Sequence, residues 1–96
     1  MELQFERTFL KDVQRLNDKR IKEKTAALLA QLQQWPTLEA VLANAGDVKK
    51  MQGFDGYYRI RLGDFRLGFA IDTLPTGPAL RLIRLLHRKE MYRYFP

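Results

Sequence analysis

The fold of this chain is decided by one stretch, YYRIRLGDFRLGF at residues 57–69. Two runs rich in aromatic and aliphatic residues flank the pair Gly63-Asp64. A glycine at the first position of a two-residue turn suits the primed turns that match the twist of β-strands. The stretch therefore predicts a tight β-hairpin, in which Arg61 lies directly opposite Arg66.

This register divides the side chains of the hairpin between two faces, because side chains alternate along a strand. One face is apolar and is expected to pack against helices; it carries Tyr58, Ile60, Leu62, Phe65, Leu67 and Phe69. The other face carries Tyr57, Arg59, Arg61, Arg66, Gly68 and Ala70. The small residues Gly68 and Ala70 predict room for a ligand above the sheet, beside the arginines.

The pair Arg61 and Arg66 indicates what that ligand is. Like charges facing each other across two strands destabilise a sheet by up to ~1 kcal/mol. A neighbouring carboxylate (Asp64, Asp72 or Glu90) or solvent screening would relieve the repulsion, and so would a bound anion. We favour the anion, and the planar fork of arginine suits phosphate because it donates two parallel hydrogen bonds.

The N-terminal half predicts a short strand followed by two helices. Glu2–Phe5 alternates polar and apolar residues, as a strand does. Thr8 is expected to cap a helix whose apolar side carries Phe9, Leu10, Val13 and Leu16. Asn17 or Asp18 is expected to cap a second helix, which Pro36 ends.

The C-terminal half predicts mainly strands. Thr37–Ala45 suits a short helix ended by Gly46, and residues 47–54 suit a loop or edge strand. Strands are expected at 57–62, 65–72 and 80–87, with a connecting loop at 74–78 and one helical turn at 89–95. Alternation along the last strand predicts that Arg81 and Arg84 point to opposite faces. The whole is expected to be a single α+β domain, residues 1–96: an antiparallel-rich twisted sheet packed against an N-terminal helical hairpin.

Composition narrows the chemistry. The chain of 96 residues has a net charge of +6 and contains no cysteine and no serine, which removes the usual thiol and hydroxyl nucleophiles. Residues 1–48 carry seven basic and seven acidic side chains, and residues 49–96 carry ten and four, so the excess charge lies in the second half. An anionic partner such as nucleic acid is expected. With one histidine, His87, neither a metal nor another cofactor is expected.

The expected location of the protein follows from two features that the sequence lacks. No apolar run approaches the ~18 residues of a membrane span, and the N-terminus lacks the pattern of a signal peptide. A cytoplasmic protein with no membrane partner is expected.

Two motifs together resemble a known family. The stretch at 57–69, followed by HRKEMY at 87–92, resembles the RelE/ParE superfamily of toxins from toxin–antitoxin systems. The order of elements is similar too, which implies a RelE-like fold. The resemblance implies a ribosome-dependent endoribonuclease that cuts mRNA in the ribosomal A site and is silenced by an acidic, RelB-like antitoxin. The ParE branch shares the fold but inhibits DNA gyrase and lacks the nuclease site.

The resemblance also implies site residues. Arg59 and Arg61 match two basic positions before the turn of the hairpin, where the best-known RelE toxin has lysines. Arg66 matches the arginine after the turn, Arg88 a later arginine and Tyr92 a C-terminal tyrosine, at a shorter spacing here. Further candidate RNA contacts are Lys49, Lys50, Tyr57 and Lys89.

These residues suggest a mechanism in which the 2′-hydroxyl of RNA attacks the adjacent phosphate. Arg61 and Arg66 would clamp the phosphate, Arg88 would assist the leaving oxygen, and Tyr92 would stack on a base. Arginine stays protonated, so the general base is left open; His87 is the first candidate and Lys89 the next. A gyrase inhibitor and a non-catalytic nucleic-acid-binding module remain alternatives.

Overall fold

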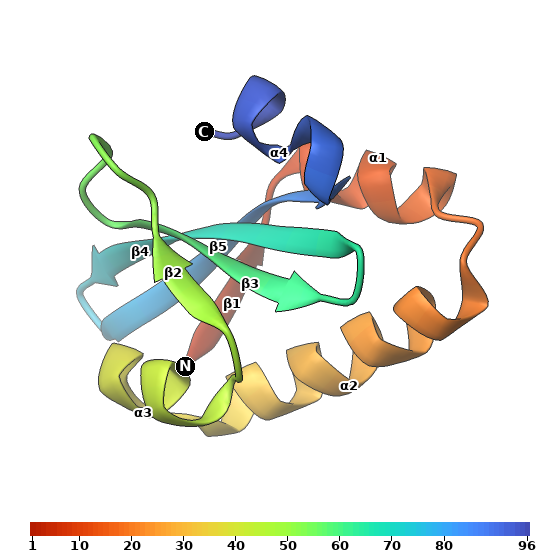
Figure 1. Cartoon of the computed structure of the whole chain (residues 1–96). Helices are drawn as coiled ribbons and strands as arrows, with labels where there is room; N and C mark the ends of the chain where they lie inside the picture. Colours follow the sequence, from red (N-terminus) through yellow and green to blue (C-terminus); the bar gives the residue numbers. More distant parts are fainter.

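The computed structural model describes residues 1–96 and is built around a five-stranded sheet in the order β1-β5-β4-β3-β2 (Figure 1). The strands are β1 (Glu2–Phe5), β2 (Val48–Lys50), β3 (Tyr57–Leu62), β4 (Phe65–Leu74) and β5 (Gly77–His87). Only β1 and β5 are parallel; the other neighbours are antiparallel, as expected.

Four helices surround the sheet: α1 (Arg7–Arg15), α2 (Lys19–Gln34), α3 (Leu38–Asn44) and α4 (Arg88–Tyr94). Helices α2 and α3 lie below the sheet in Figure 1, and α4 stands on its opposite side. The expected α+β class is confirmed. None of the helices has both the length and the apolar character needed to cross a membrane.

Helix α2 begins and ends close to where the sequence predicts. The side chain of Asp18 accepts a hydrogen bond from the N–H of Ile21 at 3.1 Å, so Asp18 rather than Asn17 is the N-cap. The helix ends at Gln34, two residues before Pro36. Its buried residues face the core: Ile21, Thr25, Leu28 and Leu32.

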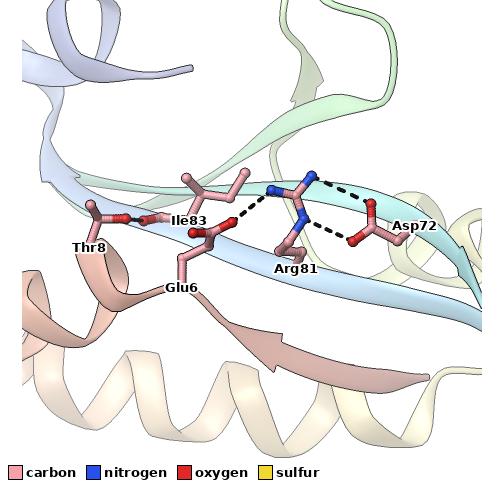
Figure 2. Close-up of polar contacts among 5 residues, drawn as sticks. All are labelled: Glu6, Thr8, Asp72, Arg81 and Ile83. Atoms are coloured by element: carbon pink, nitrogen blue, oxygen red, sulfur yellow. Dashed lines mark hydrogen bonds and ion pairs between the residues drawn. The ribbon is translucent and has the colours of Figure 1, made fainter.

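Helix α1 differs from the prediction because it runs along the edge of β5. Strand β1 pairs with β5 only as far as Leu82, and beyond it Thr8 and Asp12 of α1 form hydrogen bonds with the backbone of β5. Thr8 therefore does not cap the helix, which has Glu6 at its N-cap; its hydroxyl donates to the Ile83 carbonyl at 2.7 Å (Figure 2). Leu10 points away from the core and is 49% exposed.

An irregularity in β5 overturns the prediction for Arg81 and Arg84. Arg84 lies opposite Gly68 and Arg81 opposite Ala70, whereas the alternation between them is broken by one extra residue in β5. A bulge of this kind reverses the alternation of side chains. Both arginines therefore lie on the same face of the sheet as the arginines of the hairpin.

The hairpin of β3 and β4 has the predicted register, with Arg61 opposite Arg66. Gly63 has a φ of +59° and no residue other than glycine has a positive φ, so only the first turn position is left-handed. Strand β4 extends to Leu74 and β5 begins at Gly77, so the expected loop at 74–78 is a tight turn.

Two apolar clusters form on opposite faces of the sheet. The apolar face of the hairpin joins the main core, as expected, with all six predicted side chains in it or packed against it. A second cluster lies on the face of the sheet that carries Arg59, Arg61 and Arg66, called the arginine face below. It consists of Met51, Leu86, Met91 and Phe95. Helix α4, longer than the one turn expected, provides Met91 and its C-cap Phe95.

The second cluster fills the space that was expected to be free above Gly68 and Ala70. A Cβ atom placed on Gly68 would lie 2.7 Å from Cε1 of the Phe95 ring, and Ala70 is only 2% exposed. The prediction of an open ligand site there is wrong, because a glycine inside a strand here serves the close approach of an aromatic ring. The open part of this face lies nearer the turn of the hairpin.

This contact predicts that Gly68→Ala lowers the free energy of unfolding by about 1–3 kcal/mol, the usual cost of overpacking. Thermal unfolding measures the change. The contact itself is isolated by a double-mutant cycle with Phe95→Ala, in which Gly68→Ala should cost much less once the ring is gone. An equal cost in both backgrounds would mean that the ring does not set the requirement for glycine.

Candidate functional site

A hollow of about 390 Å³ lies between the hairpin and α4, on the arginine face of the sheet. Strands β3 and β4 contribute two of its residues and α4 the other four; it is lined by Arg59, Arg66, Arg88, Lys89, Met91 and Tyr92. A smaller cavity of about 50 Å³ shares two of these arginines and is lined by Asp47, Lys49, Arg59, Arg61 and Arg66. Cations therefore outnumber anions in both.

Arg66 lines both cavities and is held by its own turn. Its Nη1 donates hydrogen bonds to the carbonyls of Gly63 and Phe65, each at 2.9 Å. Because a guanidinium has five N–H donors, those on Nε and Nη2 are left for a ligand. Burial lowers the pKa of Arg66, and the neighbouring charges of Arg61, Arg59 and Arg88 lower it further. A bound anion would offset this repulsion.

Two other arginines on the same face are neutralised by carboxylates. Figure 2 shows Arg81 between Glu6 and Asp72, with one contact of 2.8 Å to each. These hydrogen bonds, first to Asp72 and then to Glu6, raise the pKa of Arg81. Arg84 binds Asp12 through two hydrogen bonds of 2.8 and 3.0 Å, which raise its pKa in the same way.

The arginines around the two cavities are not paired in this way. Arg59, Arg61 and Arg66 make no ion pair. Arg88 lies 4.0 Å from Asp64, with both side chains largely exposed, which is a weak interaction. Asp64, Asp72 and Glu90, which the sequence offered as neutralising partners, form no ion pair with Arg61 or Arg66, so the repulsion predicted from the sequence is present.

Tyr92 is 73% exposed at the rim of the hollow. The guanidinium carbon of Arg59 lies 4.7 Å from the centre of the Tyr92 ring, which is a cation–π contact. The contact joins β3 to α4 and sets the orientation of an aromatic surface beside the cations.

The structure therefore brings together seven of the residues predicted from the sequence. They are Lys49, Arg59, Arg61, Arg66, Arg88, Lys89 and Tyr92, which line one or both cavities. Three other predicted residues lie elsewhere.

His87 lies on the other side of the sheet, contrary to the expectation that it stands beside the arginines. It pairs with Phe65, whose side chain belongs to the core face, and the two rings meet edge to face at 5.5 Å. Its Nδ1 accepts a hydrogen bond from the backbone N–H of Lys89 at 3.2 Å.

Lys50 and Tyr57 also lie away from the hollow. Lys50 is opposite Tyr58, which places it on the face opposite the arginines, and its Nζ lies 3.3 Å from Asp55. Tyr57 is at the far end of β3 and packs on Phe95, with the ring centres 6.1 Å apart.

Two residues of the site were missed. Asp47 lines the smaller cavity and its backbone carbonyl accepts from the N–H of Arg61 at 3.0 Å, while Met91 lines the larger one. Gly68 indicated that another segment approaches this face, because a glycine within a strand marks such an approach, but the side chain that meets it is Phe95 and not Met91. For Asp47 we see no signal, since it lies in an irregular segment before β2.

Comparison with known protein sequences gives two consistent findings. The family model described as "ParE toxin of type II toxin-antitoxin system, parDE" matches residues 3–92. The toxin RelE3 of Methanocaldococcus jannaschii is 32% identical over 96 residues, which is the full length of both chains. The sequence similarity therefore extends over the whole chain.

Solved structures agree. The RelB-RelE antitoxin-toxin complex from Methanococcus jannaschii contains a chain 32% identical, with a TM-score of 0.71, covering 97% of this chain and 99% of that one. The YoeB/ParE toxin from Agrobacterium tumefaciens is 22% identical, with a TM-score of 0.68, covering 91% and 98%. At 22% identity, the second similarity shows only that the two chains share a fold.

Proposed function

Because this chain belongs to the RelE/ParE superfamily and is a RelE-like toxin of a toxin–antitoxin system, we propose that it cleaves mRNA on the ribosome as an endoribonuclease. The observation that carries this proposal is the cluster of Arg59, Arg61, Arg66 and Arg88 around the hollow and the smaller cavity beside it, left without strong carboxylate partners. Arginines elsewhere on the same face are fully paired. An RNA phosphate is the anion that fits such a cluster.

The reaction needs no nucleophile from the protein. The 2′-oxygen of the RNA forms a bond to the adjacent phosphorus as the bond to the 5′-oxygen breaks, giving a 2′,3′-cyclic phosphate and a 5′-hydroxyl. Arg61 and Arg66 stabilise the extra negative charge on the phosphate oxygens. Arg88 donates a hydrogen bond to the leaving oxygen, which takes its proton from water.

The remaining residues position the RNA. Tyr92 stacks on an unpaired base, as aromatic side chains do with single-stranded RNA. Arg59 orients the Tyr92 ring and contacts the RNA backbone, and Lys49 adds a further cation at the smaller cavity.

The general base of this proposal is Lys89. An arginine is a poor base because it stays protonated, and His87 faces away from the hollow. Lys89 lines the hollow, and its neutral amine accepts the proton of the 2′-hydroxyl.

Adding the purified protein to translating ribosomes tests the proposal. We expect cuts at A-site codons and no cleavage where the attacking nucleotide is 2′-deoxy. In single-turnover assays, Lys89→Met should lower the rate of cleavage. Cleavage of the 2′-deoxy substrate would contradict the mechanism.

The same assay separates the alternatives. The match to the ParE toxin family favours a gyrase inhibitor as the second candidate. Intact mRNA together with arrested supercoiling by DNA gyrase would select it, and nucleic-acid binding without either effect would select a binding module.

Partners follow from the same proposal. The structural relatives include RelB-RelE complexes, which supports an antitoxin partner. We propose that the antitoxin is acidic and RelB-like, because an acidic segment complements the cluster of arginines. The other partner is mRNA on the ribosome, so the protein acts in the cytoplasm.

A further inference from the structure

His87 occupies the N-cap position of α4, the helix that carries half of the proposed site. Its backbone is extended, with φ −59° and ψ 144°, and its Nδ1 accepts the N–H of Lys89, the second residue of the helix. An N-cap side chain makes this bond to satisfy a backbone donor that has no partner within the helix.

Helix α4 depends on such anchors because it has only seven residues. Helices this short are not stable on their own. Its first turn is held by the His87 cap and by the N–H of Arg88, which donates to the carbonyl of Asp64 at 2.7 Å. Its C-terminal end is held by the ring of Phe95, which packs against Gly68 of β4.

The residues directly after the cap are functional ones in our proposal. Arg88 and Lys89 are the first two residues of α4 and line the hollow, whereas the His87 ring packs on Phe65 on the other side of the sheet. The imidazole therefore affects the hollow through the helix and not by touching a ligand.

We propose that His87 is a positioning residue, whose ring caps α4 through Nδ1 and so fixes Arg88 and Lys89 against the arginines of the hairpin. The bond requires an unprotonated Nδ1, because an imidazolium has only donors. This inference rests on the proposed nuclease function for its activity readout.

Two substitutions separate capping from proton transfer. Asparagine is among the best N-cap residues but does not titrate, so His87→Asn should keep cleavage near the rate of the parent protein. His87→Ala should lower kcat/KM on translating ribosomes about tenfold, because misplaced catalytic groups cost at least that much.

A matched control is available in α3, which also has seven residues. The hydroxyl of Thr37 accepts from the N–H of Ala40 at 3.1 Å and caps that helix, which contributes nothing to the hollow. Thr37→Ala should lower the melting temperature about as much as His87→Ala and leave cleavage unchanged.

The inference fails if His87→Ala cuts as fast as the parent, or if the alanine and asparagine variants are equally impaired, which would assign chemistry to the imidazole. Amide hydrogen exchange tests the cap without any cleavage assay. Amide hydrogen exchange within α4 should be faster in His87→Ala than in the parent protein, and in His87→Asn it should equal that of the parent protein. If the parent protein cuts no mRNA but the exchange follows this pattern, the nuclease proposal falls and the cap stands; unchanged exchange in the alanine variant overturns the cap.

Discussion

Replacing Arg66 by alanine is expected to lower the rate of mRNA cleavage by about 10²–10³, the usual loss when one preorganised donor to a transition state is removed. Arg66 lines both cavities and has donors free for a phosphate. Its pKa is lowered by burial and by three neighbouring arginines, so its charge is unfavourable in the free protein. Arg66→Ala should therefore leave the melting temperature unchanged or raise it.

Loss of activity without loss of stability is the pattern that marks a functional residue. Arg7→Ala is the matched control, because it removes the same charge from an exposed position on α1. Arg66→Lys keeps the charge but loses the planar fork, and it should recover only part of the activity. If Arg66→Ala and Arg7→Ala cleave equally fast, the proposed phosphate clamp is wrong.

The second large effect is expected at Asp12, the buried carboxylate of α1. Asp12 pairs with Arg84 through two hydrogen bonds and also accepts the N–H of Leu85 at 2.9 Å. Its side chain is 6% exposed and that of Arg84 is 20% exposed. Asp12→Ala leaves a mostly buried charge and a backbone donor without partners, which should cost about 3 kcal/mol of unfolding free energy.

Chemical denaturation measures this cost, and Asp55→Ala is its control. Asp55 forms an ion pair with Lys50 but its side chain is fully exposed, so its loss should leave the midpoint unchanged. Adding Arg84→Met to Asp12→Ala removes the orphaned charge and should recover part of the stability. Equal midpoints for Asp12→Ala and Asp55→Ala would show that the buried pair contributes no stability.

Local signals in the sequence predicted much of the fold. The turn at Gly63-Asp64 set the register of the hairpin, because a two-residue loop allows one pairing of the flanking strands. Asp18 and Pro36 marked the start and end of α2 for similarly local reasons. The prediction that Thr8 caps α1 was wrong because its hydroxyl donates a hydrogen bond to β5, at a residue 75 positions further along the chain.

The site was predicted in part. The arginines of the hairpin follow from alternation within a single motif, so their shared face could be predicted. His87 was misplaced because its nearness in sequence to Arg88 was taken as nearness in space, whereas the last residue of β5 and the first of α4 lie on different sides of the sheet.

By itself, the sequence determined the hairpin, its opposed arginines and the excess of positive charge, because each depends on residues close together along the chain. The tertiary structure decided which of those charges stay unpaired. Acids from β1–α1 and from β4 reach Arg81 and Arg84 but not Arg61 or Arg66. It also decided that Phe95 covers the arginine face at Gly68 and that residues of α4 line the hollow nearer the hairpin turn. Such partners come from distant segments, and only the packing of the whole chain brings them together.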